Sequence, residues 1–121
     1  MPDHINYITE AQLIAINKAV GETGTVTNRA NLEFTILKIH KTKDLYKAAS
    51  HLLVGIVTMH PFVDGNKRTA LNALLYLLEI NGKKIDPNEE KKVLVLKLIY
   101  DIVNNTMSET EVEKEIKKVI E

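Results

Sequence analysis

Apolar residues recur every three or four positions along most of the chain, which is the spacing of one face of an α-helix. Thr9 and Gln12 predict a capping box at the start of a first helix that should end near Gly21. The apolar face of that helix is formed by Leu13, Ile16 and Val20. A loop or short hairpin over residues 21–28 should follow. A second, shorter helix should then place three residues on its apolar face, namely Leu32, Ile36 and Ile39.

A third helix should begin near Thr42 and stop at His60, because Pro61 disfavours helical geometry in the residue before it and should leave His60 extended. Its apolar positions keep the helical period without a gap, and they are Leu45, Ala48, Ala49, Leu52, Leu53 and Ile56. This regular spacing makes it the clearest helix in the sequence.

A fourth helix should start at about Gly65 and run to Ile80, with Asn81 and Gly82 as its C-terminal stop. From Ala70 onward the helix is apolar almost all round. A helix without a clear polar face belongs in the centre of a bundle, so we expect the other helices to pack around this one.

Two further helices are expected in the last third of the chain. Asp86 and Pro87 indicate a helix start, and the segment after them, residues 93–103, is rich in β-branched residues. A strand is therefore an alternative there, although the cap and the length favour a helix. Ser108 and Glu111 cap a last helix, whose apolar stripe is formed by Val112, Ile116, Val119 and Ile120. The pattern predicts an all-α bundle of about six helices.

Composition narrows the class of protein further. The 121 residues fit one domain, residues 1–121, and 16 basic residues balance 16 acidic ones, which does not favour nucleic acid or a membrane surface as a partner. The absence of cysteine excludes disulfides and thiolate zinc sites. The longest apolar segment, residues 71–80, is too short to span a bilayer, and the N-terminus does not resemble a signal peptide. We therefore expect a cytoplasmic protein.

The segment His60 to Ala70, HPFVDGNKRTA, crowds polar groups between two apolar stretches. The first amides of a helix that starts near Gly65 have no internal partners, and the helix dipole adds partial positive charge, so phosphate can bind there. Asn66, Lys67 and Arg68 add donors and two positive charges. Cations are unfavourable in a first helical turn, and an anion placed between them would explain their presence.

The same segment offers a base and a metal ligand. Asp64 could hold Mg²⁺ that bridges phosphate oxygens, and His60 could accept a proton from a hydroxyl nucleophile. Together these groups predict phosphoryl or nucleotidyl transfer. Taken singly, Asp64 is better explained as a helix N-cap, His60 as a partly buried polar residue, and Lys67 and Arg68 as surface charges. Their conjunction favours a site, and the apolar pair at residues 62–63 should hold the loop on the core.

The segment HPFVDGNKR resembles the signature of Fic-domain proteins, HxFx(D/E)GNxRxxR, and it is most similar to the Doc branch, the toxins of toxin–antitoxin pairs. Lys67 lies where most Fic enzymes have a second glycine, and Leu71 lies where the signature has its second arginine. The short chain, YIT at residues 7–9 and NLEF at residues 31–34 also resemble Doc proteins. The resemblance extends from about residue 7 to residue 82.

The resemblance implies a Fic-fold bundle with the motif on the loop and start of its central helix. By position, it makes His60 the general base and Asp64 the Mg²⁺ ligand. The phosphate contacts that it implies are Gly65, through its backbone, Asn66, Lys67 and Arg68. Residues 23–29 correspond to the flap that docks the target backbone.

Most Fic enzymes transfer AMP from ATP to a hydroxyl, whereas Doc proteins bind ATP the other way round and phosphorylate a threonine of the elongation factor that delivers aminoacyl-tRNA. Lys67 fills the space that a glycine leaves for the distal phosphates, and Leu71 removes a donor to them. We therefore expect transfer of the γ-phosphate of ATP, with Mg²⁺, to a Ser or Thr of a protein resembling elongation factor Tu. The alternatives are a Fic-type AMP transferase and an inactive helical adaptor.

No glutamate in the chain is followed by glycine or asparagine, so the pattern (S/T)xxxE(G/N) of the inhibitory helix in many Fic proteins is absent. A transferase without this internal inhibitor needs one in trans. The resemblance thus implies an antitoxin partner, whose amphipathic helix should lie in an apolar groove of the bundle.

Overall fold

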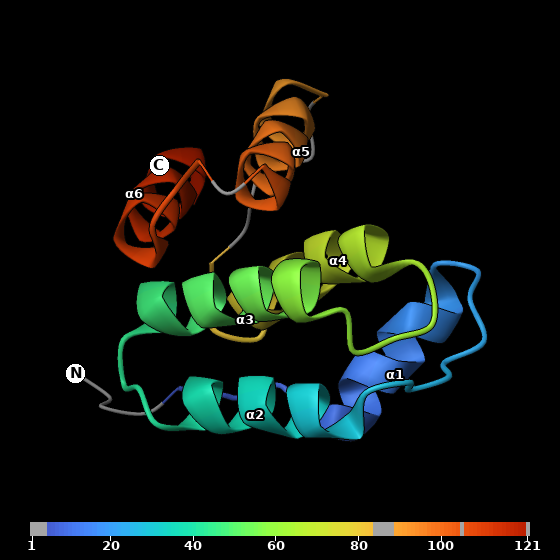
Figure 1. Ribbon diagram of the computed structural model, residues 1–121. Coiled ribbons are helices and arrows are strands. Elements are labelled where there is room, and N and C mark those ends of the chain that lie inside the picture. Colours follow the sequence, from blue (N-terminus) through green and yellow to red (C-terminus); the bar gives the residue numbers. More distant parts are fainter. Residues whose placement is uncertain (1–4, 84–88, 105, 121) are drawn as a thin grey trace.

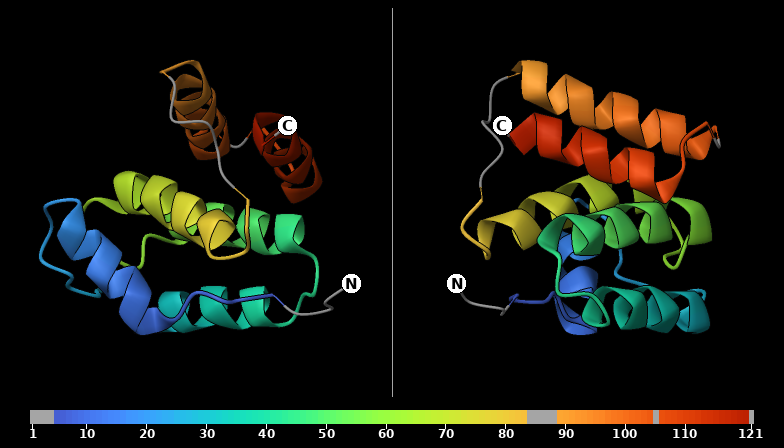
Figure 2. Two further views of the ribbon diagram at one scale, coloured as in Figure 1. Left: turned by 180° about the vertical axis from the view of Figure 1, so that it is seen from behind. Right: turned by 90° about the vertical axis from the view of Figure 1, so that its left-hand side faces the viewer.

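The computed structural model describes residues 5–83, 89–104 and 106–120, which form six α-helices. In chain order these are α1 (Glu10–Ala19), α2 (Arg29–His40), α3 (Leu45–Met59), α4 (Asn66–Glu79), α5 (Glu89–Val103) and α6 (Glu109–Ile120). They form three layers, with α3 and α4 between the pair α1–α2 and the pair α5–α6 (Figures 1 and 2). The predicted all-α bundle of about six helices is confirmed.

The middle layer supplies most of the core. Helix α3 packs against α2, α4, α5 and α6, and α4 packs against α1, α3 and α5. The helix that follows the motif therefore shares the centre of the bundle with α3. The two helices bury their apolar faces completely at the following positions: Ala48, Ala49, Leu52, Leu53, Ile56, Ala70, Ala73, Leu74, Leu77 and Leu78.

The predicted capping boxes are present. At α1, Thr9 Oγ1 accepts a hydrogen bond from the Gln12 amide at 3.1 Å, and Gln12 Oε1 accepts one from the Thr9 amide at 2.8 Å. Ser108 and Glu111 repeat this arrangement at α6. There the Ser108 backbone hydrogen bond to the carboxylate lowers the pKa of Glu111. Local hydrogen bonding thus fixes the first turn of both helices.

The predicted stop of α4 is also confirmed. Gly82 has a φ of +78°, in the left-handed region that glycine enters without steric cost. Its amide donates to the Glu79 carbonyl at 3.1 Å, and the Lys83 amide donates to the Leu78 carbonyl at 2.9 Å. This pair of bonds is the Schellman arrangement that closes a helix.

Two boundaries differ from the prediction, and both are set by a capping side chain. The second helix is not the shorter one, since α2 has 12 residues and α1 has 10. It is extended at its start because Asn28 accepts a hydrogen bond from the Asn31 amide at 3.0 Å. The third helix begins at Leu45 and not near Thr42, because Asp44 caps it.

The C-terminal segment with many β-branched residues is helical, which confirms the helix over the strand alternative. Asp86 and Pro87, the predicted start of that helix, lie outside the described residues. None of the helices in the described part of the chain is long and apolar enough to cross a lipid bilayer.

Helices α2 and α3 approach each other closely at one glycine. A Cβ atom added to Gly55 would lie 2.6 Å from both Cγ2 and Oγ1 of the buried Thr35 side chain. Only glycine leaves room for this contact between the two helices.

We predict that Gly55→Ala lowers the free energy of unfolding, measured by urea denaturation, by about 1–3 kcal/mol, because overpacking outweighs the better helix propensity of alanine. Thr35→Ala removes the two closest atoms and leaves only Cβ, at 3.1 Å, so Gly55→Ala should cost clearly less stability in that background. An equal loss of stability in both backgrounds would contradict this contact.

Candidate active site

The motif loop joins α3 to α4 and begins at His60, which ends α3 as predicted. His60 is left-handed, with φ 47° and ψ 60°, and not extended. A left-handed residue also ends a helix, but holding a non-glycine residue there costs free energy, so neighbouring contacts must stabilise it. One such contact comes from Asn31 on α2, whose Nδ2 donates to the Met59 carbonyl at 2.6 Å.

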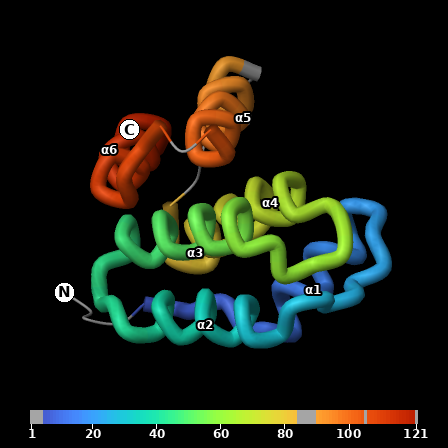
Figure 3. The backbone as a smooth tube through the Cα atoms, in the orientation of Figure 1, coloured from blue at the N-terminus to red at the C-terminus, as the bar shows by residue number. Residues whose placement is uncertain are grey.

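A second set of contacts joins the motif loop to the loop between α1 and α2. Two amides of residues 25–28 donate to the Pro61 carbonyl at 2.9 and 3.2 Å, and the Val63 amide donates to the Thr25 carbonyl at 3.0 Å. The two loops form an antiparallel β-bridge, and they run side by side in Figure 3. The α1–α2 loop therefore pairs with the motif and does not fold into its own hairpin.

The bridge explains how the apolar pair of the motif is oriented. Successive side chains of an extended segment point in opposite directions, so only one of the pair can face the core. Phe62 is buried, as predicted, whereas Val63 is 56% exposed and does not hold the loop on the core.

The Asn66 carboxamide holds the loop in shape. Its Oδ1 accepts from the Phe62 amide at 3.0 Å, and its Nδ2 donates to the Phe62 carbonyl at 2.9 Å. Asn66 is also the first residue of α4, where backbone amides lack helical partners. Its predicted contribution to anion binding is therefore best made by the backbone amide.

The N-terminal end of α4 receives no cap from its own chain segment. The N-cap residue is Gly65, with a φ of +72°, and the first turn contains no acidic residue. Asp64 does not act as the N-cap, since its Oδ1 accepts from the Gly65 amide at 2.8 Å and not from amides within the helix. The simple capping explanation for Asp64 is thus wrong, and the start of α4 retains its partial positive charge.

An open cavity of about 370 Å³ lies over the motif in front of this helix end. It is lined by His60, Val63, Asp64, Gly65, Asn66, Lys67 and Arg68, which include all six predicted site residues. Neither the His60 imidazole nor the Lys67 ammonium makes a hydrogen bond or ion pair with any described residue. The cavity thus combines an available base, a carboxylate and positive charge.

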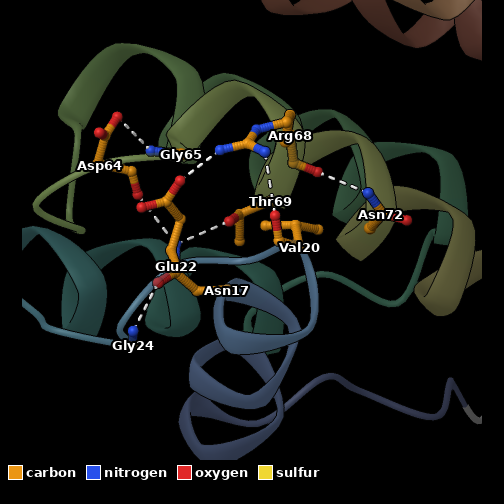
Figure 4. A network of polar contacts seen from close by, with 9 residues as sticks. All are labelled: Asn17, Val20, Glu22, Gly24, Asp64, Gly65, Arg68, Thr69 and Asn72. Carbon is orange, nitrogen blue, oxygen red and sulfur yellow. Dashed lines mark hydrogen bonds and ion pairs between the residues drawn. The ribbon is translucent and has the colours of Figure 1, made fainter.

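Arg68, in contrast, already has partners. Its Nη1 donates to the Val20 carbonyl at 3.0 Å, and its Nη2 forms an ion pair with Glu22 (Figure 4). The Arg68 side chain is 59% exposed and that of Glu22 only 18%. The two adjacent cations of the motif are therefore not equivalent, because only the charge of Arg68 is neutralised.

The site depends on a residue that the sequence analysis missed, Asn17 of α1. This side chain is fully buried, and its Nδ2 donates to the Asp64 carbonyl and to Thr69 Oγ1, both at 3.0 Å. Its Oδ1 accepts from the Gly24 amide at 2.9 Å (Figure 4). A signal was present, since Asn17 lies four residues after Leu13, on the face of the first helix that was predicted to be buried.

The residues of the cavity fit Mg²⁺ bound together with a phosphate ligand. The exposed Asp64 carboxylate uses one oxygen for the Gly65 amide and keeps the other for a metal. The described residues contain no group of three or more His, Asp or Glu side chains able to form a complete metal site. Mg²⁺ is usually held by one or two carboxylates and by substrate phosphates, which matches a single aspartate.

We predict that Asn17→Leu lowers the free energy of unfolding by at least about 2 kcal/mol, because it leaves the buried Thr69 hydroxyl and two backbone groups without these partners. Chemical denaturation measures the loss. Asn72→Ala is the matched control, since Asn72 is exposed and makes one local bond to the Arg68 carbonyl. Equal effects of the two substitutions would show that Asn17 has no special role.

Comparison with known proteins gives one family. A search of curated proteins finds no match to the chain. The model of the Fic/DOC family, in contrast, matches residues 7–78, which is more than half of the chain and includes every residue that lines the cavity. The chain therefore belongs to the Fic/DOC family, whose members are transferases of nucleotide or phosphate groups.

Proposed function

We propose that this protein transfers the γ-phosphate of ATP to a Ser or Thr hydroxyl of a protein target. The observation that carries the proposal is that His60, Asp64 and the uncapped start of α4 line one cavity. Fic/DOC proteins generally bind ATP with Mg²⁺, and a base, a metal ligand and a phosphate site are the groups that phosphoryl transfer needs.

In this proposal the backbone amides at the start of α4 and the Lys67 ammonium bind the phosphates. Helix N-terminal amides suit phosphate oxygens, and Lys67 has no competing partner among the described residues. Asp64 would hold Mg²⁺, which neutralises phosphate charge when bound. The Asn66 carboxamide contributes by keeping the loop in the shape that presents these amides.

His60 acts as the general base. As the target hydroxyl oxygen attacks the γ-phosphorus, the imidazole accepts the hydroxyl proton, the bond from the γ-phosphorus to the β–γ bridging oxygen breaks, and ADP leaves. The imidazole is exposed at the cavity, so a target hydroxyl can reach it. Imidazole is the side chain that most often takes up a proton in general base catalysis.

Two positions support γ-phosphate transfer over AMP transfer. Lys67 lies exposed at the cavity, where its side chain takes up the space that a glycine would leave. Leu71, at the place of the second arginine of the Fic signature, packs partly buried against the core and offers no donor. Both features weaken binding of distal phosphates in the AMP-transfer orientation.

We also propose, from the family resemblance, that the protein acts in the cytoplasm as a toxin controlled by an antitoxin. Its target is then a translation elongation factor resembling elongation factor Tu. The pairing of the α1–α2 loop with the motif supports a docking role for residues 23–29, because it places this segment next to His60.

Incubation with ATP labelled at the α or the γ position, with Mg²⁺ and elongation factor, distinguishes the two reactions. We expect label from the γ position on the target and none from the α position, with a mass increase of one phosphate. Label from the α position would establish the AMP transferase instead, and label from neither would favour the adaptor.

His60→Ala should reduce target modification by about a hundred- to ten-thousand-fold, the usual effect of losing a general base, while ATP binding is largely retained. His40→Ala is a matched control, because His40 also lies at the end of a helix but does not line the cavity. The proposal fails if both variants modify the target at the rate of the unaltered protein.

A further inference from the structure

Glu22 lies in the loop between α1 and α2, yet its side chain reaches the start of α4 (Figure 4). It forms an ion pair with Arg68, and it packs against Gly65 so closely that a Cβ there would lie 2.5 Å from Glu22 Cγ and 3.3 Å from Oε2. A carboxylate from outside the helix therefore lies beside the end of α4 where a phosphate is expected to bind.

The electrostatics of this helix end explain why a carboxylate is stable there. No acidic residue stands in the first turn of α4 and no side chain caps its N-terminus, so negative charge is favourable at this end. Glu22 supplies such a charge beside the helix end and at the same time neutralises Arg68, so it makes the ion pair that an anionic ligand in the neighbouring cavity would make with Arg68.

We propose that Glu22 is an internal competitor for the phosphate group. Glu22 neutralises Arg68 in the structure, and a bound phosphate takes Arg68 from it. The proposal rests on the proposed function only in requiring that a phosphate binds in this cavity, and it requires no transfer reaction.

The geometry favours competition over a role in positioning Arg68 for the ligand. The guanidinium is already oriented by the Val20 carbonyl, a neutral acceptor that does not repel an anion. Arg68 is the more exposed partner of the ion pair and already lines the cavity, whereas Glu22 is largely buried and packs against Gly65. A phosphate in the cavity and the Glu22 carboxylate therefore compete for one guanidinium, which forms its charge-assisted hydrogen bonds with one of them at the expense of the other.

Competition makes Glu22 a specificity-determining residue. A ligand with one phosphate gains too little from the helix end and Lys67 to displace a carboxylate from Arg68. A polyphosphate carries several negative charges. One of its phosphates can pair with Arg68 in place of Glu22 while the others bind the helix end and Lys67. Glu22 thus favours ligands with a chain of phosphates over those with one.

The test is calorimetric titration of inorganic triphosphate and of orthophosphate, each with Mg²⁺, into the full-length protein and two variants. Glu22→Gln keeps the shape that packs against Gly65 and removes the charge. We expect it to bind triphosphate about tenfold more tightly, the effect of gaining one charge-assisted hydrogen bond, and to raise the affinity for orthophosphate by a larger factor, so that the preference for triphosphate falls. Glu10→Gln is the matched control, because Glu10 also pairs with an arginine, Arg29, but lies outside the cavity, and it should bind as the unaltered protein does.

A second background separates competition for Arg68 from general repulsion. In Arg68→Gln, the additional substitution Glu22→Gln should no longer increase triphosphate affinity. Unchanged or weaker binding by Glu22→Gln, a gain that persists without Arg68, or a lack of triphosphate binding by every variant would each overturn the proposal. Tighter binding by Glu22→Gln together with a lack of label transfer from ATP would support this inference while contradicting the proposed function.

Discussion

The candidate site depends on the buried carboxamide of Asn17. Through three hydrogen bonds, this side chain joins the α1–α2 loop at Gly24, the motif loop at Asp64 and the first turns of α4 at Thr69. These segments are distant in sequence, and no apolar contact could fix the direction of their backbone groups in the same way. A buried side-chain amide whose hydrogen bonds are all formed stabilises the fold. It also selects one arrangement of the three segments, because any other arrangement would leave polar groups unpaired.

Because the two loops are held together, the adjacent cations Lys67 and Arg68 have different surroundings, although they look alike in the sequence. Lys67 faces the cavity without a partner among the described residues, whereas Arg68 is bound to the loop through Val20 and Glu22. The two cations of the site therefore differ in availability. Lys67 can bind an anion directly, whereas Arg68 can do so only when the anion replaces Glu22.

The features that depend on residues close together in the chain could be predicted from the sequence. Helical periodicity, the capping boxes at Thr9 and Ser108, and the stop at Gly82 are local signals, and the structure confirms them. The six motif residues could be placed together because they are close in sequence. The role of Glu22 could not be predicted, since its partner lies 46 residues away and the contact depends on the packing of α1 against α4. Val63 was misplaced for a related reason: the β-bridge that turns it outward joins two loops remote in sequence.

The hydrogen bond from Asn31 to the Met59 carbonyl joins the start of α2 to the end of α3, next to the proposed general base. Asn31 lies in the first turn of α2, two residues after the segment 23–29, and Met59 precedes His60. A displacement of residues 23–29 would therefore reach the backbone that precedes His60 through the start of α2. If a polypeptide docks on residues 23–29, as proposed, its arrival would be mechanically linked to the alignment of the His60 imidazole, although the two elements share no catalytic group.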